Sequence, residues 1–491
     1  MNTPATPAFL HDTLWTGKIF NGGWIDADGG THAIIEPATG QQLGSTGQAN
    51  ARDVARAAIA ARAAQRDWAA TDYKARAAIF RKAAALFEQH HAELAVWVAR
   101  ETGATMPKAD LELREAVVYM HEAAAMLTQP QGQLLASPHQ QLSIARRLPH
   151  GVVGVISPFN FPLILSLRSI APALAVGNAV LHKPDLQTPV SGGVMIARIF
   201  EQAGLPPGVL HVLPGGAEAG EALCLDPHIA MISFTGSTQV GRRVAELAGK
   251  TLKKVALELG GKNSLIVLDD ADPDLAAANV AWGAYLHQGQ ICMASGRILL
   301  QRGIAAAVTE RLLEKARHLP VGDPMSGKVA LGPLINTRQV QRIHGIVHDS
   351  VAAGATLLAG GSHDGIFYPP TVLTDVRPGM RCFEEELFGP VASITVFDTD
   401  EEAIALASQT EGCLALGVIS PSLARALHIV NRVPCGHAHV NDQTVLAEAH
   451  VPFGGSGSSG NGARHGGPAD WDEFSQWQWL TIKSDAPRYP F

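Results

Sequence analysis

Cys292 is the residue of this sequence whose type and surroundings best suit covalent chemistry. It lies in the segment YLHQGQICMASGR (residues 285–297), where Gly289 and the small residues 294–296 leave room around the sulfur for a substrate. A thiolate is a strong nucleophile, and an acyl group held on sulfur can still be hydrolysed. A lone cysteine, however, is more often an inert small apolar residue. This segment alone leaves both interpretations open.

A carboxylate precedes this cysteine in an unusual setting. Glu258 stands near the end of the apolar run VALEL and just before Gly260 and Gly261. Charged side chains are rarely placed in such a run without a partner or a function. Glu258 could serve as a general base, or it could form an ion pair where two domains meet.

The segment IAMISFTGSTQVG (residues 229–241) has the pattern of a phosphate-binding turn. A predicted strand runs into Gly236 and Ser237, and a helix follows from about Thr238. The free N–H groups at a helix start attract phosphate, and Gly236 lets the backbone approach a ligand closely. Gly241 lets the first helical turn pack tightly. An ordinary capped turn would have the same appearance.

Two further motifs are incomplete. Residues 455–460 satisfy GxGxxG, but no helical pattern follows them, so we assign them to a glycine-rich loop. His121 and Glu122 begin like HExxH, but Ala125 stands where the second histidine would be. The five cysteines are widely spaced and show neither a disulfide framework nor a CxxC pattern. We therefore expect no metal site.

The elements that must position these side chains follow from the spacing of apolar residues. Residues 51–129 are rich in alanine at helical spacing. From Gly151 short apolar strands alternate with helices, which predicts a parallel, doubly wound, Rossmann-like α/β domain. A second α/β series runs from Ser264 to about Val440. The predicted strands of the first series are 152–156, 179–183, 209–213, 229–234 and 254–259, and its helices are 162–176, 190–202 and 238–248.

Two β segments have no partner nearby in the sequence. Residues 133–147 resemble a hairpin, and residues 473–483 (EFSQWQWLTIK) resemble a lone strand. Because unpaired strand edges need a partner, we expect these segments to pair across a subunit interface in a homodimer or homotetramer. The expected domains are a dinucleotide-binding domain (1–130 and 148–259), a catalytic domain (260–445) and an oligomerisation element (131–147 and 470–491).

Composition excludes several classes of function. The chain has 491 residues, a formal net charge of −7 and scattered basic residues, which argues against a nucleic-acid partner. No signal peptide is visible at the start, and the most apolar stretch, residues 161–176, is too interrupted to cross a membrane. With cysteines that form no framework, a cytoplasmic protein is expected.

An ordered set of motifs makes the chain resemble the aldehyde dehydrogenase superfamily from about Gly23 to Lys483. The spacing from Glu258 to Cys292 is also that of the family. The motifs are PFNFP (158–162), Lys183-Pro184, FTGS (234–237), ELGGK (258–262), QGQICMASGR (288–297), EEELFGPV (384–391), HVND (439–442) and VPFGG (451–455).

The resemblance implies a role for each catalytic candidate. Cys292 would attack the aldehyde carbon, and the resulting oxyanion would be held by the amide of Asn160 and the backbone N–H of Cys292. Hydride transfer would leave a thioester on the sulfur. Glu258 would activate water to hydrolyse that thioester and could also deprotonate Cys292. Its presence favours a free acid as the product.

The resemblance also implies a dinucleotide site for NAD or NADP. Ser237 would lie near the phosphates, Lys183 at the adenosine ribose and Gly215 beside the adenine. Many NAD-preferring relatives carry Glu three residues after the lysine, but Leu186 stands here and does not repel a 2′-phosphate. We therefore expect both cofactors to be accepted. The remaining cofactor candidates are Ile156, Ser157, Pro158, Phe159, Phe234, Thr235, Gly236, Leu259, Gly260, Glu386 and Phe388.

Within the superfamily, three phrases resemble benzaldehyde- and vanillin-type dehydrogenases: residues 166–174, 287–293 and 439–469. Phe161 and Leu165 could form an apolar wall for an aromatic ring, or they could be ordinary core residues. Arg168 falls beside the family's substrate tunnel. Medium-chain aliphatic aldehydes and semialdehydes are the alternative substrates. A thiol esterase and a non-catalytic binding protein are the alternatives from other classes.

Overall fold

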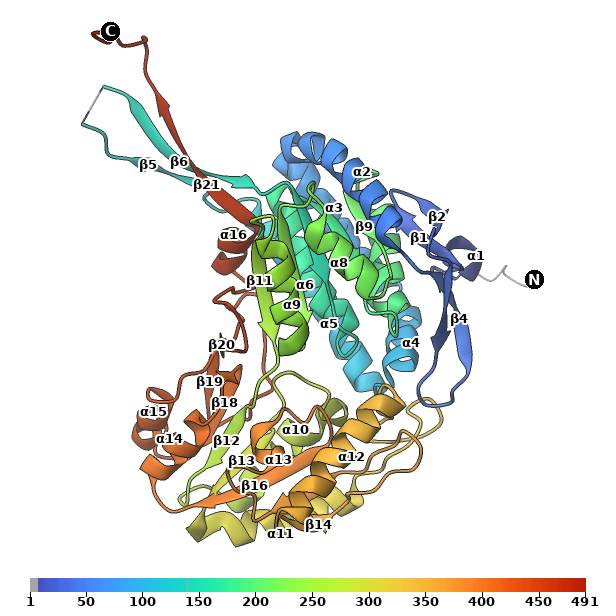
Figure 1. Ribbon diagram of the computed structural model, residues 1–491, viewed down its shortest axis with the longest axis vertical. Helices are drawn as coiled ribbons and strands as arrows, with labels where there is room; N and C mark the ends of the chain where they lie inside the picture. Colours follow the sequence, from blue (N-terminus) through green and yellow to red (C-terminus); the bar gives the residue numbers. More distant parts are fainter. Residues whose placement is uncertain (1–7, 139) are drawn as a thin grey trace.

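Two seven-stranded β-sheets follow one another along the long axis of the molecule, and a three-stranded sheet projects from one end (Figure 1). The computed structural model describes residues 8–138 and 140–491. No helix among these residues has the length and apolar character needed to cross a membrane. Both large sheets are built mainly from parallel strands, so the predicted α/β class is confirmed.

The first large sheet has the doubly wound order that the sequence predicts. The chain moves from β7 to β8 and β9 on one side and then returns to β10 and β11 on the other. This reversal places a topological switch point between β7 and β10, where such sheets bind ligands at their carboxyl ends. Its parallel strands are β7 (Val152–Ile156), β8 (Ala179–Lys183), β9 (Leu210–Val212), β10 (Met231–Gly236) and β11 (Lys254–Leu259).

Two short antiparallel strands, β1 (Lys18–Asn21) and β2 (Trp24–Asp26), extend this sheet beyond β9 and were not predicted. Nor was helix α8 (Ala217–Leu225). The short N-terminal elements α1 (Asp12–Trp15), β3 (Thr31–Ile35) and β4 (Gln42–Gly47) lie beside them. The expected crossover helices are α6 (Pro162–Val176), α7 (Met195–Ala203, after the π-helical turn Val190–Val194) and α9 (Thr238–Gly249).

Alternate residues of the strands point to opposite faces, which is why helices cover both sides of this sheet. Val153 and Val155 of β7 pack into one hydrophobic cluster with α6, while Val152 and Ile156 pack into another with α9. The alanine-rich region forms four helices: α2 (Ala51–Ala70), α3 (Tyr73–Gln89), α4 (His91–Thr102) and α5 (Met106–Met126).

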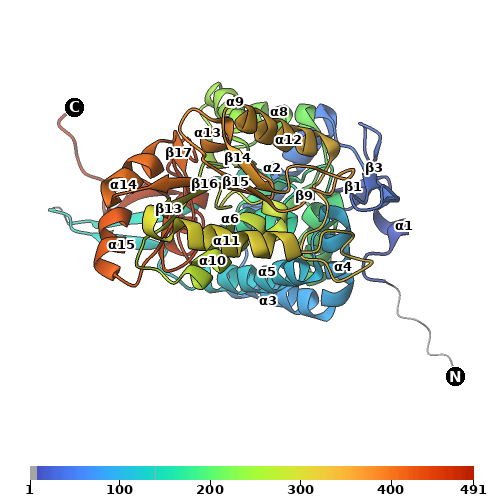
Figure 2. The ribbon, with the colours of Figure 1, turned by 90° about the horizontal axis from the view of Figure 1, so that it is seen from below.

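The second large sheet is layered in the same way. Leu265 and Val267 of β12 pack with α10 and α11, whereas Ile266 packs on the opposite face with α12 (Figure 2). The sheet order is β14-β15-β16-β13-β12-β18-β19. Its strands are β12 (Ser264–Val267), β13 (Arg297–Gln301), β14 (Thr356–Ala359), β15 (Thr371–Thr374), β16 (Val391–Phe397), β18 (Ala415–Ile419) and β19 (His437–Val440). Its helices are α10 (Pro273–Tyr285), α11 (Arg302–His318), α12 (Thr337–Ala352), α13 (Arg381–Glu384), α14 (Asp400–Ser408) and α15 (Leu423–Val430).

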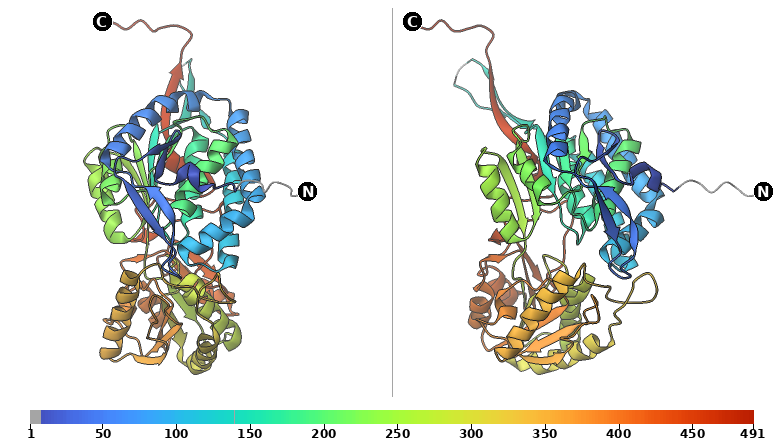
Figure 3. Two further views of the ribbon diagram at one scale, coloured as in Figure 1. Left: turned by 90° about the vertical axis from the view of Figure 1, so that its right-hand side faces the viewer. Right: turned by 45° about the vertical axis from the view of Figure 1, so that its right-hand side comes forward.

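The pairing predicted for the isolated β segments needs a correction. Strand β21 (Ser475–Ile482), which follows α16 (Pro468–Phe474), pairs along its whole length with β6 (Leu142–Pro149) of the same chain. Strand β5 (Gly132–Leu135) pairs with the other edge of β6. The two segments therefore complete each other within one chain rather than across an interface. Together they form an arm that extends beyond the body of the molecule (Figure 3).

The two large sheets face each other through a short connection. β11 ends at Leu259 and β12 begins at Ser264, so the carboxyl end of the first sheet meets the amino end of the second. Gly241 of α9 makes this junction tight, because a Cβ there would lie 2.4 Å from the Leu259 side chain. The glycine-rich loop 455–460 also packs here, as Leu259 N donates to Ser459 O (3.0 Å). The regular structure of that loop is the two-residue strand β20 (Ser456–Gly457), which pairs with β17 (Gly412–Cys413).

Candidate active site

Three segments that are distant in the sequence meet where the two large sheets face each other. Asn160 follows β7, Glu258 lies in β11, and Cys292 lies in the loop before β13. One narrow cavity is lined by Cys292 together with Lys262, Glu386 and Phe388. Glu258 lies within electrostatic range of the sulfur. The structure therefore brings the predicted chemical groups to a single location.

The backbone before Cys292 is held in a strained turn. His287 and Gln288 have positive φ angles of 46° and 54°, and Gly289 follows at 66°. Such angles are costly for non-glycine residues and persist only where the surroundings impose them. The Gln288 side chain supplies part of that constraint by donating to the carbonyls of Gly103 (2.8 Å) and Pro333 (2.9 Å). The loop is thereby fastened to both halves of the molecule.

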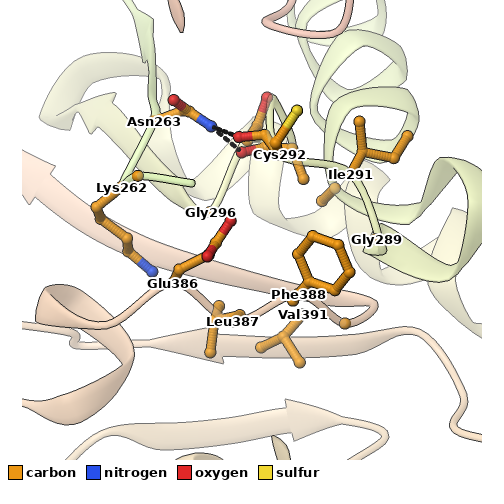
Figure 4. Close-up of a pocket in the computed structure, with 15 residues that line it drawn as sticks. Lys262, Asn263, Gly289, Ile291, Cys292, Gly296, Glu386, Leu387, Phe388 and Val391 are labelled. Atoms are coloured by element: carbon orange, nitrogen blue, oxygen red, sulfur yellow. Dashed lines mark hydrogen bonds between the residues drawn. The ribbon is translucent and has the colours of Figure 1, made fainter. Parts of the chain in front are cut away.

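Asn263 anchors the nucleophile loop itself, and the sequence analysis did not single it out. Its Nδ2 donates to the backbone carbonyls of Cys292 (2.7 Å) and Ala294 (3.1 Å), as Figure 4 shows. Its Oδ1 accepts from the backbone N–H groups of Leu414 and Ala415. One buried amide thus satisfies four backbone groups. The only signal in the sequence was its position immediately after ELGGK.

Burial controls the charge of both reactive groups. Desolvation raises the pKa of Cys292 to about 12, against a smaller opposing effect of the Arg168 charge. Desolvation likewise raises the pKa of Glu258 to about 8, with Arg168 and Arg464 opposing it. Neither carboxylate oxygen of Glu258 has a hydrogen-bond partner among the described residues. At neutral pH the resting thiol is therefore protonated, and Glu258 can exchange a proton near the working pH.

Asn160 is positioned by a buried ion pair on α5. Its Nδ2 donates to Gln290 O (2.8 Å) in the nucleophile loop, two residues before Cys292. Lys108 donates to Asn160 O (2.8 Å) and pairs with Glu112. Glu112 in turn accepts from backbone N–H groups at the start of α6. The predicted oxyanion donor is thus fixed beside the loop, and no motif in the sequence pointed to Lys108 and Glu112, the two charges that fix it.

The predicted phosphate turn is a free helix start at the carboxyl end of β10. Ser237 caps α9, since its Oγ accepts from Val240 N (3.4 Å). Gly236 is required by close packing, because a Cβ there would lie 2.5 Å from the Phe234 ring. Thr235 Oγ1 accepts a hydrogen bond from Arg168 (2.9 Å). The free N–H groups of α9 can therefore receive an anion at the junction of the two sheets.

The cofactor-binding candidates at the ends of β7 and β8 differ in whether their side chains are free to bind a ligand. Lys183 Nζ donates to Gly215 O (2.8 Å), which confirms that these two predicted residues are neighbours. Ser157, by contrast, directs its hydroxyl into the core, where it contacts His182 (2.9 Å) and Ser166 (2.8 Å). Its side chain is already engaged. Ile156 and Pro158 flank it, and Phe159 makes an edge contact with Phe388 (centroids 6.0 Å apart).

Glu386 lies against the glycines after β11. A Cβ on Gly260, next to Leu259, would come within 2.6 Å of the Glu386 carboxyl group, so only glycine permits this approach. Burial raises the pKa of Glu386 to about 7. The Cys292 side chain points away from this carboxylate in Figure 4. Glu386 and Glu258 are thus separate acidic groups, one beside the glycine turn and one in β11.

An apolar cluster surrounds the sulfur. The partly buried Cys292 packs against a group that includes both predicted wall residues, Phe161 and Leu165. The Phe161 ring also lies 4.3 Å from Lys108 Nζ, which fixes its position. The other buried members are Ile291, Met293, Leu414, Ala415 and Phe453. These surroundings suit a flat apolar substrate better than a charged one.

Comparison with known proteins identifies relatives along almost the whole chain. The aldehyde dehydrogenase family profile matches residues 24–480. The chain is 52% identical to a vanillin dehydrogenase of Amycolatopsis sp. over 485 residues, which are 99% of this chain and 100% of that protein. It is 51% identical to the NAD(+) benzaldehyde dehydrogenase of Pseudomonas putida over 479 residues, 97% of this chain and 98% of that protein.

Solved structures agree with these relatives. The NAD-dependent aldehyde dehydrogenase of Sinorhizobium meliloti superposes with a TM-score of 0.93 at 34% identity, covering 100% of this chain and 98% of that one. An NADP-dependent enzyme of E. coli also gives a TM-score of 0.93, at 32% identity, covering 96% and 98%. The fold is therefore shared along its full length.

Asn263→Ala tests whether this amide holds the nucleophile loop. The variant leaves backbone N–H and C=O groups unpaired, so we expect a loss of about 2–4 kcal/mol in the free energy of unfolding and much slower alkylation of Cys292. Denaturant unfolding and mass spectrometry of the modified peptide measure the two effects. Ser264→Ala is the matched control, because the neighbouring buried Ser264 hydroxyl has no hydrogen-bond partner. Equal behaviour of the two variants would contradict the role of Asn263.

Proposed function

The chain belongs to the aldehyde dehydrogenase family and is an oxidoreductase that acts on aldehydes, and from this premise we propose that it oxidises aromatic aldehydes to carboxylic acids. The observation that carries the proposal is the apolar cluster of Phe161, Leu165 and Phe453 around Cys292. An aromatic ring placed there would have its carbonyl carbon beside the sulfur. The relatives that are half identical to the chain are named for vanillin and benzaldehyde.

The proposed reaction begins at Cys292. The thiol loses its proton, with Glu258 as the acceptor, and the sulfur adds to the aldehyde carbon. The oxyanion that forms receives hydrogen bonds from Asn160 Nδ2 and the Cys292 backbone N–H. Bound NAD or NADP supplies the acceptor for the hydride that the adduct loses, which leaves a thioester on the sulfur. Glu258 releases this first proton to solvent and then takes a proton from water; the hydroxide attacks the thioester, the acid leaves, and the sulfur regains a proton.

The residues at the switch point fit a dinucleotide. The free start of α9 at Ser237 would hold the phosphates, and Lys183 beside Gly215 would hold the adenosine ribose. Glu386 and Phe388 would hold the nicotinamide ribose. Leu186, three residues after the lysine, neither bonds ribose hydroxyls nor repels a 2′-phosphate. We propose that both NAD and NADP are accepted.

A panel of aldehydes tests the substrate and the cofactor together. We expect kcat/KM for benzaldehyde and vanillin to exceed that for hexanal and succinate semialdehyde, followed by the absorbance of reduced nicotinamide. Cys292→Ser should lower the rate by orders of magnitude, whereas Cys435→Ser, at another partly exposed thiol, should not. A preference for aliphatic substrates would contradict the aromatic assignment. A preference for NAD of several hundred-fold would contradict dual cofactor use.

Glu258→Gln tests the deacylation step. The amide cannot accept a proton from water, so we expect a burst of reduced cofactor equal to the enzyme present, followed by stalling. In the parent enzyme, turnover should rise with pH through the region near 8, because the protonated carboxyl cannot act as a base. Glu246→Gln, at an exposed carboxylate of α9, is the control. Steady turnover of Glu258→Gln with an unchanged pH profile would rule out this role.

The three-stranded arm supports a proposal that the protein is a homodimer or homotetramer. Strands β5 and β21 form its two edges, and their apolar side chains are open to solvent; Leu134 is 74% exposed and Trp479 70%. Extended exposed apolar edges are rarely left uncovered. We propose that residues 131–147 and 470–491 form the oligomerisation element, with 1–130 and 148–259 as the dinucleotide-binding domain and 260–445 as the catalytic domain.

We also propose that the protein acts in the reducing cytoplasm. All five cysteines are free thiols, which supports this location.

Leu134→Glu tests the proposed interface. A buried glutamate at the edge of β5 would be desolvated on association, so we expect the molar mass by light scattering at micromolar concentration to fall. Ile59→Glu, at a similarly exposed apolar residue of α2 (59%), should leave the mass unchanged. A monomeric parent protein would contradict the assembly.

A further inference from the structure

Arg168 is a buried cation that the proposed mechanism does not use. It lies on α6 with 4% of its surface exposed. One guanidinium nitrogen donates to Thr235 Oγ1 (2.9 Å), and the Phe453 ring centroid lies 4.8 Å from Cζ. Its Nε has no hydrogen-bond partner, and no carboxylate among the described residues forms an ion pair with it. Its positive charge is therefore held in the protein without an anionic partner.

Burying a charge without a counter-ion costs free energy. The groups that the Arg168 charge reaches therefore indicate what the charge does. Thr235, which anchors Arg168, stands directly opposite Glu258 in the parallel pairing of β10 and β11. The guanidinium is thus held one strand away from a carboxylate that has no hydrogen-bond partner within the part of the chain that the structure describes. Its charge also reaches the sulfur of Cys292. One cation therefore acts on both groups whose anionic forms the reaction requires.

We propose that Arg168 is an electrostatic positioning residue that favours the anionic forms of Glu258 and Cys292 during the reaction. This inference rests on the proposed function of those two residues. The unpaired state of Arg168 is central to it, because a carboxylate bound to the guanidinium would cancel the field at the site. Phe453 and Thr235 satisfy the guanidinium without neutralising it.

The other charged groups near the site do not replace Arg168. Glu258 also faces two other charges. That of Arg464 lowers the Glu258 pKa, and that of Glu473 raises it. Arg464 is partly exposed and donates to the backbone carbonyl of Ala463. Solvent therefore screens the Arg464 charge more strongly than the buried Arg168 charge. The remaining group facing Cys292 is Glu386, which acts in the opposite sense.

Four further titratable groups face Arg168, and of these four only Asp470 can offset its charge near pH 8. Burial lowers the pKa of His437 to about 4 and that of His465 well below its usual value, so both are neutral at working pH. Burial raises the pKa of Tyr119 to about 12 and that of Asp470 to about 7. Asp470 instead accepts a hydrogen bond from Gly466 N.

The direction of the effect follows from the burial of the site. The pKa of Glu258 is about 8 and that of Cys292 about 12 with the Arg168 charge in place. Loss of the charge raises both values further, because each anion loses a favourable interaction. The rising limb of the kcat–pH profile should then move to higher pH, and the thiolate fraction should fall at every pH below the thiol pKa.

Arg168→Met removes the charge, and Arg168→Lys retains it. We expect Arg168→Met to move the rising limb of kcat upward by about one pH unit and to slow iodoacetamide alkylation of Cys292 about tenfold between pH 7 and 9. Alkylation is measured by mass spectrometry on the enzyme without aldehyde. Arg168→Lys should restore both values toward the parent. The control is Ser169→Ala on the same helix as Arg168, because it removes a buried hydrogen bond to Ser233 of β10 without changing charge.

Several outcomes would overturn the proposal. Parent-like profiles for Arg168→Met would do so, as would equal shifts for Arg168→Lys and Arg168→Met. A raised KM confined to aldehydes with an anionic ring substituent, with both pH profiles unchanged, would instead make Arg168 a substrate ligand. If Arg168→Met does not fold, Thr235→Val, which removes the anchor, should give a smaller shift in the same direction, and its absence would count against the proposal. Aldehyde oxidation that survives Cys292→Ser would contradict the proposed function itself, whatever Arg168 does.

Discussion

The rest of the structure depends on the desolvation of ionisable groups at the junction of the two large sheets. Cys292, Glu258 and Glu386 all have raised pKa values because the protein excludes water around them. This burial favours the protonated thiol of Cys292 and raises the pKa of Glu258 to about 8. It also strengthens every charge that remains, since Coulomb interactions grow as the local dielectric falls. A few fixed cations can therefore control the reactivity of the site.

Such a site needs a rigid backbone, because hydrogen bonds and fields depend on distance. Rigidity here comes from polar side chains that bind backbone groups of other segments. Asn263 and Gln288 fasten the loop of Cys292 on either side of the sulfur, and Glu112 fastens the start of α6 beyond Asn160. In each case one buried side chain satisfies several groups that would otherwise be orphaned. The geometry of the proposed catalytic groups is thus a product of the same interactions that stabilise the junction.

Sequence reasoning predicted the elements of this site better than their supports. Strands β7, β8 and β11 and helix α6 have the predicted bounds, because short apolar runs, prolines and glycines mark them locally. Strand β21 and the hairpin that contains most of β6 were both located and expected to pair, but the pairing was wrongly placed across a subunit interface. More than three hundred residues separate the two strands, and no local pattern shows whether they pair within one chain. Lys108 and Asn263 escaped notice for a related reason. Their importance comes from backbone groups of distant segments, which only the folded chain brings near.

Lys183, one of the side chains proposed to hold a dinucleotide, is already satisfied by the protein, and this limits how it can contribute to binding. Lys183 donates to Gly215 O, so a ribose hydroxyl must replace that bond rather than add to it. Exchanging one hydrogen bond for another yields little net free energy. The start of α9 has less to give up, because its cap from Val240 N to Ser237 Oγ is long (3.4 Å), and the helix dipole favours an anion there. We therefore expect the phosphates to supply most of the affinity and the ribose contacts to select which cofactor is held and in which orientation.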